Sequence, residues 1–155
     1  MVYSRIARTA DAVYVVGLSK SIASYNLHVQ VLSPDTGEAL SNAQIPSNIY
    51  NGLTDFLVMS NVTSDIVSPN IIWLEKGAMR HVMLTPKLNE KSMVIKGVTY
   101  KSIFNIGLNE QGYFVALKDD GTARVLRLDE QGTRVNPIFE YPESVRGPFA
   151  DGYKI

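Results

Sequence analysis

The side chains able to do acid–base or metal chemistry are few and widely spaced in this sequence. His28 and His81 are the two histidines, and there is no cysteine. Neither histidine has another histidine or a carboxylate two or four positions away, the spacing that pairs metal ligands on a strand or a helix. We therefore expect no metal site. Each histidine suits a solvent-facing strand position or a hydrogen-bonded place in the core.

Catalysis by a serine or by paired carboxylates has little support. A serine hydrolase would need a Gly-x-Ser-x-Gly elbow, which the sequence lacks. A glycosidase would need two opposed carboxylates; Asp55, Asp65 and Glu75 are available, but 15 acidic residues make some pair inevitable. The segment Ser33–Gly37 is similar to the hairpin box of sialidases without its tryptophan, and that box braces a turn. We expect no catalytic residue and no cofactor.

One segment is a candidate modification site. Asn61-Val62-Thr63 is the only Asn-x-Ser/Thr sequon with a non-proline middle residue. Such a sequon accepts an N-linked glycan in a secretory or luminal protein, and a chance match is the alternative. It lies within residues 60–70, which are rich in Asn, Ser and Pro. We expect that stretch, like residues 46–53, to be a surface loop.

The elements that position these residues are predicted to be strands. The 155 residues include 36 Val, Ile and Thr and 14 aromatic residues, which suit pleated, half-buried surfaces. Short runs alternate apolar and polar residues, and helical spacing is hard to find. We predict eleven strands: Ala12–Leu18, Tyr25–Ser33, Glu38–Ile45, Asp55–Ser60, Ile71–Glu75, Ala78–Thr85, Ser92–Lys96, Ser102–Leu108, Tyr113–Lys118, Ala123–Asp129 and Arg134–Tyr141.

Charge and hydropathy exclude several partners. The 15 basic and 15 acidic side chains give a net charge of zero, which removes the attraction that nucleic acids and anionic membranes exert on their binders. The longest apolar run, Ala12–Leu18, is too short to span a bilayer. We expect no nucleic-acid partner and no membrane span, and we expect the chain to begin inside a larger protein.

The spacing of the strands favours a repeated architecture. Several strands run into an acidic turn that ends in Gly and return, as in Ser33–Gly37 and Asp119–Gly121. This resembles the repeat of quinoprotein-like propellers, whose blades take about 40–45 residues. We predict an all-β fold in which residues 1–155 are a single domain or fragment of three to four blades, each an antiparallel four-stranded meander. A β-sandwich or a barrel is the alternative.

Read at full length, the sequence resembles the luminal part of the largest subunit of the ER membrane protein complex, in the form found in filamentous fungi. The resemblance runs from about Asp11 to Tyr141, and no single motif in it is diagnostic. It is carried by residues 25–29 (YNLHV), 32–37 (LSPDTG), 53–57 (LTDFL), 72–75 (IWLE), 84–88 (LTPKL), 98–101 (VTYK) and 107–116 (GLNEQGYFVA).

The resemblance implies a non-enzymatic scaffold at the luminal face of the ER, in a complex that inserts and helps fold multi-pass membrane proteins. Its partners would be other subunits of that complex and client membrane proteins. A fragment of a quinoprotein-like or sialidase-like propeller enzyme, and a free-standing β recognition module, are the alternatives.

An incomplete propeller should leave two blade faces uncovered and lined by apolar side chains. Unless another chain supplies the missing blades, we therefore expect two copies to pack face to face in an isologous contact or to exchange a terminal strand, with the last residues, 141–155, involved. Trp73, the only tryptophan, is expected to pack in the core or between blades rather than to stack on a ligand.

Overall fold

The polypeptide forms only β-strands and connections in the part of the chain that the structure describes. The structure is a computed structural model, and it describes residues 2–63, 66–88, 93–95, 99–105, 112–128 and 135–140. These residues contain twelve strands and no helix, so no helix among them is long and apolar enough to cross a membrane. The predicted all-β class is confirmed.

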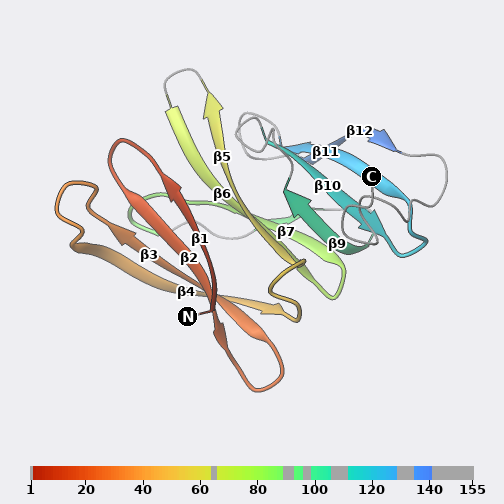
Figure 1. Cartoon of the computed structure of the whole chain (residues 1–155), viewed down its shortest axis with the longest axis horizontal. Helices are drawn as coiled ribbons and strands as arrows, with labels where there is room; N and C mark the ends of the chain where they lie inside the picture. The colour runs from red at the N-terminus through yellow and green to blue at the C-terminus, as the bar shows by residue number, and fades with distance from the viewer. Residues whose placement is uncertain are drawn as a thin grey trace.

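The strands form three separate four-stranded sheets, each an antiparallel meander of consecutive strands. Sheet A has the order β1-β2-β3-β4, sheet B the order β5-β6-β7-β8, and sheet C the order β12-β11-β10-β9. Figure 1 shows sheet B between the other two. The strands are β1 (Val2–Arg8), β2 (Val13–Lys20), β3 (Tyr25–Leu32), β4 (Ala39–Ile49), β5 (Phe56–Thr63), β6 (Ile66–Glu75), β7 (Ala78–Met83), β8 (Met93–Ile95), β9 (Tyr100–Asn105), β10 (Tyr113–Lys118), β11 (Ala123–Leu128) and β12 (Val135–Glu140).

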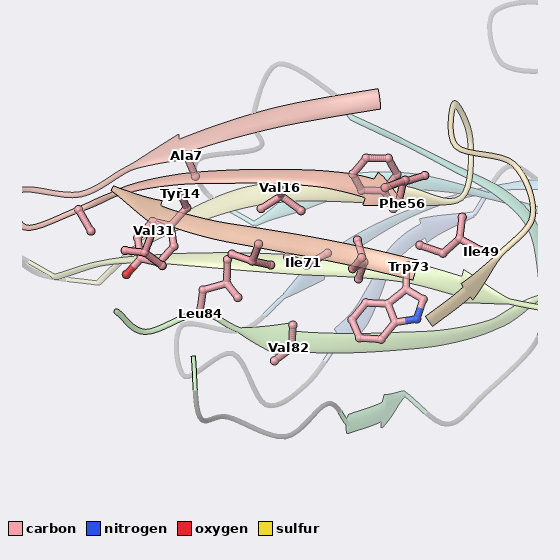
Figure 2. Close-up of a cluster of buried hydrophobic side chains, with 14 residues drawn as sticks. Ala7, Tyr14, Val16, Val31, Ile49, Phe56, Ile71, Trp73, Val82 and Leu84 are labelled. Atoms are coloured by element: carbon pink, nitrogen blue, oxygen red, sulfur yellow. The ribbon is translucent and has the colours of Figure 1, made fainter. Parts of the chain in front are cut away.

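Alternating side chains create one apolar core on each side of sheet B. Between sheets A and B, Tyr14, Val16 and Leu27 of sheet A face Ile71 and Trp73 of sheet B, and all are at most 1% exposed. Figure 2 shows the Trp73 ring enclosed in this cluster. The second core joins sheets B and C and is made of Leu57, Met59, Ile72, Leu74, Met79, Tyr100, Ile103, Phe114, Ala116, Leu126 and Leu128. Successive residues of β5 and β6 therefore serve opposite cores.

The first strand of each sheet lies against the first strand of the next, so that β1 contacts β5 and β5 contacts β9. Two backbone hydrogen bonds join sheets B and C here. Ile103 N–H donates to Thr54 O at 2.8 Å, and Tyr100 N–H donates to Gly77 O at 2.9 Å. Both donors belong to β9, and the acceptors belong to the loop before β5 and to the β6–β7 turn, so β9 is bonded to two connections of sheet B.

Of the two predicted surface loops, the one over residues 46–53 is right for residues 50–53 but wrong for residues 46–49, which belong to β4. The loop predicted over residues 60–70 is wrong in its described part, because residues 60–63 belong to β5 and residues 66–70 to β6, which pair until Thr63 lies opposite Ile66. The hydrogen bonds of a hairpin join main-chain N–H and C=O groups and do not require apolar side chains. A stretch rich in Asn and Ser can therefore still form strands. Pro46 is tolerated because β4 is an edge strand.

The first strand, β1, was not predicted. Its pairing with β2 shifts register between Val2 and Arg5, and Tyr3 has a left-handed φ of 54°. A bulge of this kind breaks the alternation by which strands are recognised in a sequence. Of its side chains, Ala7 is buried and Ile6 is 70% exposed.

The expected open apolar end faces are not found as predicted. On the face of sheet C turned away from sheet B, Val115, Leu117 and Ala123 are each at most 5% exposed. On the corresponding face of sheet A, polar His28 and Gln30 alternate with the core residues of β3. Residues 141–155, expected to take part in self-association, lie outside the described residues, so association of two copies stays a prediction.

Candidate interaction surface

The two histidines lie in different sheets and different environments. The ring of His28 is on an open face of sheet A, with its Nε2 2.7 Å from Asn42 Oδ1. His81 is 1% exposed inside sheet B, with its Nε2 2.8 Å from Asn70 Oδ1. The structure therefore does not bring them together. Among the described residues there is no group of three or more His, Asp or Glu side chains that could hold a metal ion.

Asp55 and Glu75 each serve a local structural purpose. Asp55 accepts hydrogen bonds from Asn51 N–H and from the Thr54 hydroxyl, both at 3.1 Å, and so closes the loop before β5. Its partial burial raises the pKa of the carboxyl, against the lowering effect of these two bonds. Glu75 accepts from Trp73 Nε1–H at 3.0 Å. Asp65 lies outside the described residues.

The segment Ser33–Gly37 is the turn between β3 and β4, as predicted for a hairpin tip. Ser33 Oγ accepts from Asp35 N–H and from Thr36 N–H, each at 3.3 Å. Gly37 has a φ of 74° and donates its N–H to Ser33 O at 2.9 Å. The serine and the glycine thus brace the turn.

Large exposed apolar side chains gather at one end of sheet A. Three different segments supply them: Tyr3 from the start of β1, Ile22 from the β2–β3 turn, and Tyr50 and Leu53 from the loop between β4 and β5. They are 39%, 100%, 49% and 65% exposed. We call these four residues, with the partly buried Tyr25, the apolar end cluster. This end is the lower part of Figure 1, near the N-terminus.

Contacts among these segments fix the cluster. The rings of Tyr3 and Tyr25 meet edge to face, 6.2 Å apart and 85° inclined. A Cβ atom at Gly52 would overlap the Tyr3 ring and lie 2.9 Å from Leu18 Cδ1, so only glycine fits beneath that ring. Ser24 Oγ is 3.5 Å from Asn48 Oδ1 and ties the β2–β3 turn to the end of β4.

The bulge in β1 determines where the Tyr3 ring lies. Tyr3 holds a left-handed backbone conformation that a bulky residue seldom adopts. β-Bulges redirect side chains, and strained residues of this kind persist where neighbouring structure holds them. Tyr3 lies within this register shift, and its ring packs against Tyr25 and over Gly52.

The surroundings of the cluster are polar and carry few charges. Its segments hold Ser21, Ser24, Asn48 and Asn51, with Lys20 exposed beside the β2–β3 turn and the half-buried Asp55 at the end of the β4–β5 loop. Tyrosine, serine, asparagine and glycine are the residues that antibody paratopes use to bind protein surfaces. Nucleic-acid and anionic-membrane binding would require several cations here.

Sequence reasoning missed this surface because Tyr3 lies on the unpredicted strand and the cluster draws on distant segments. One signal was available: Ile22 is a lone aliphatic residue in a turn between serines. Trp73, by contrast, is fully buried between sheets A and B, which confirms the prediction of core or inter-sheet packing.

Comparison of the chain with protein-family models, curated proteins and solved structures finds no match.

Proposed function

We propose that this protein is a non-enzymatic interaction module, and that the apolar end cluster is its docking surface. Exposed Tyr, Ile and Leu side chains from three segments lie there, and the Tyr3 ring is held in place by its contact with Tyr25 and its close approach to Gly52. This cluster is the observation that carries the proposal. Clustered exposed apolar residues within a polar surround are characteristic of protein-binding sites.

The partner we propose is a folded protein with an apolar, weakly charged surface. Tyrosine rings bury a large area at a low entropy cost, and they form binding hot spots when water is excluded. Ile22 and Leu53 add exposed aliphatic area to this surface. With a net charge of zero, long-range electrostatic steering contributes little, so contact chemistry must select the partner.

The sequence resemblance supports a specific setting for this module. In that setting the chain is part of a quinoprotein-like β-propeller at the luminal face of the ER membrane protein complex. It docks other subunits of the complex and so supports the insertion and folding of multi-pass membrane proteins. Three consecutive four-stranded meanders, with their first strands side by side, are the geometry that propeller blades have.

The test replaces the two most exposed aliphatic residues of the cluster. We expect an Ile22→Ser/Leu53→Ser double variant, directed to the ER, to lose co-purification with subunits of the complex. Leu40→Ser is the matched control, because Leu40 is 55% exposed on the same sheet but outside the cluster. Two hot-spot truncations at about 1–2 kcal/mol each weaken binding by at least tenfold.

Folding is checked separately in these variants by their urea midpoints, which should stay near that of the unmodified chain because exposed side chains contribute little to stability. Retained co-purification in the double variant would show that the docking surface lies elsewhere. Absence of the complex subunits from purifications of the unmodified chain would contradict the proposed setting.

A further inference from the structure

The sequon at Asn61 lies in a part of the β5–β6 hairpin that extends past the rest of sheet B. β5 and β6 pair until Thr63 lies opposite Ile66. Among the described residues, the last backbone bond from the β7 side to β6 is from Leu84 N–H to Pro69 O, at 2.8 Å. Beyond Pro69 the hairpin is a two-stranded ribbon, and Figure 1 shows it projecting above the neighbouring strands.

Position along β5 places the sequon far from the apolar end cluster. β5 begins at Phe56, directly after the loop that holds Leu53, and Asn61 comes five residues later. At about 3.3 Å per residue this is on the order of 17 Å from the start of the strand. β5 is also the edge strand of sheet B, so within that sheet it has one neighbour. The backbone position of Asn61 is therefore toward the end of β5 that points away from the cluster.

We propose that Asn61 is the acceptor of an N-linked glycan at the end of the module opposite to its docking surface. The proposal rests on the luminal setting of the proposed function, because glycan transfer occurs there. The sequon supplies the two required parts, the Asn61 amide and the Thr63 hydroxyl. Residue 62 is valine, which permits the transfer.

The transfer needs a polyprenyl-diphosphate-linked oligosaccharide as co-substrate. The amide nitrogen of Asn61 attacks the anomeric carbon of the first sugar and forms a C–N bond. The bond from that carbon to the diphosphate oxygen breaks, the polyprenyl diphosphate leaves with the electron pair, and the amide loses one proton. Nothing is oxidised or reduced.

The experiment is expression of the full chain behind a cleavable secretion signal in a glycosylating eukaryotic host. Intact mass is measured before and after treatment with peptide N-glycosidase. We expect one removable glycan on the unmodified chain and on Thr63→Ser, and none on Asn61→Gln or Thr63→Ala. Asn136→Gln is the matched control outside any sequon and should keep the glycan.

A second sequon tests whether the host and the folded chain permit glycan transfer at all. Asp120→Asn creates one with Gly121 and Thr122, in the exposed turn between β10 and β11. In an Asn61→Gln background this variant should regain one glycan. If the Asp120→Asn chain is modified while Asn61 in the unmodified sequence is not, the proposal is overturned.

Binding distinguishes this proposal from the proposed function. Enzymatic removal of the glycan should leave co-purification with complex subunits unchanged, because the glycan lies at the opposite end. Loss of co-purification on deglycosylation would overturn the opposite-end placement. An unglycosylated Asn61 with intact subunit binding would overturn the glycan alone, and a glycosylated chain without subunit binding would overturn the proposed function alone.

Discussion

The guanidinium carbon of Arg5 lies 5.2 Å from the centre of the Phe56 ring. Arg5 is on the first strand of sheet A and Phe56 opens the first strand of sheet B, so this contact joins the strands along which the two sheets approach each other. A cation over a buried aromatic ring stabilises by about 0.5–2 kcal/mol. This cation–π contact therefore adds an electrostatic attraction between sheets A and B to the apolar packing of their core.

We expect Arg5→Met to lower the free energy of unfolding by about 1 kcal/mol, because methionine keeps the aliphatic stem but removes the charge over the ring. Urea unfolding measures this. Arg8→Met, on the same strand and exposed, is the control and should change stability by less than about 0.5 kcal/mol. Equal stabilities for Arg5→Met and the unmodified chain would show that the charge contributes nothing.

Gly77 and Gly37 offer a matched test of the junction between sheets B and C. Both have a left-handed φ, 85° and 74°, so alanine is strained at either position. A Cβ at Gly77 would also lie 3.1 Å from Thr99 Cβ and 3.2 Å from Tyr100 O, whereas at Gly37 nothing lies within 4 Å. We expect Gly77→Ala to cost roughly 1–3 kcal/mol more than Gly37→Ala in urea unfolding. Equal losses of unfolding free energy in the two variants would mean that Thr99 and Tyr100 move away from the added methyl group without loss of stability.

Asp55 should make stability fall as the pH rises. Burial raises the pKa of Asp55 above its ordinary 3.8, so the folded chain holds that proton more tightly than the unfolded chain. The resulting stability is complete below pH 3.8 and is lost as the pH passes the raised value. We expect Asp55→Asn to gain stability relative to the unmodified chain over that interval, measured by urea unfolding at several pH values.

Asp120 should make stability change with pH in the opposite direction to Asp55. Hydrogen bonds from the Thr122 hydroxyl and then the Thr122 N–H lower the pKa of Asp120. Its contribution is present above pH 3.8 and disappears as the pH falls through the lowered value. Asp120→Asn should therefore lose stability relative to the unmodified chain with rising pH. If the stability of Asp55→Asn and of Asp120→Asn, each relative to the unmodified chain, changed in the same direction with rising pH, the environments described for the two carboxylates would be contradicted.

Trp73 reports on the interface between sheets A and B. The indole is fully buried and is the only one in the chain. We expect native emission to be blue-shifted and poorly quenched by acrylamide, and Trp73→Ala to cost about 3–5 kcal/mol. Native emission resembling that of free tryptophan would contradict the closed interface.

Sequence patterning was sufficient for the regular parts of the fold. β3 follows its predicted range closely because its side chains alternate, and both β3 and β10 end at an acidic turn that contains Gly. It failed where backbone pairing overrides composition, as in the β5–β6 ribbon, and where a bulge interrupts alternation, as in β1. Period and propensity describe the preference of single residues, and both exceptions are decided by backbone pairing with the next strand along the chain.

The candidate surface was less predictable than the fold. Ile22 lies in the β2–β3 turn and Leu53 in the β4–β5 loop. These connections share one end of sheet A because of the order in which the strands pair, and a local sequence pattern does not specify that order. The sequon at Asn61 was visible in the sequence, but its place on a projecting ribbon was not.

Each sheet is made from one continuous stretch of chain, which has a consequence for biosynthesis. Sheet A is complete once Ile49 has emerged, yet Tyr14, Val16 and Leu27 are covered only by residues up to Leu84 of sheet B. At about 5–20 residues per second, the nascent chain takes roughly 2–7 s to make that cover. During this interval a finished sheet presents its apolar side to the surroundings. Chaperone binding at the ribosome is therefore most needed by nascent chains between these two lengths.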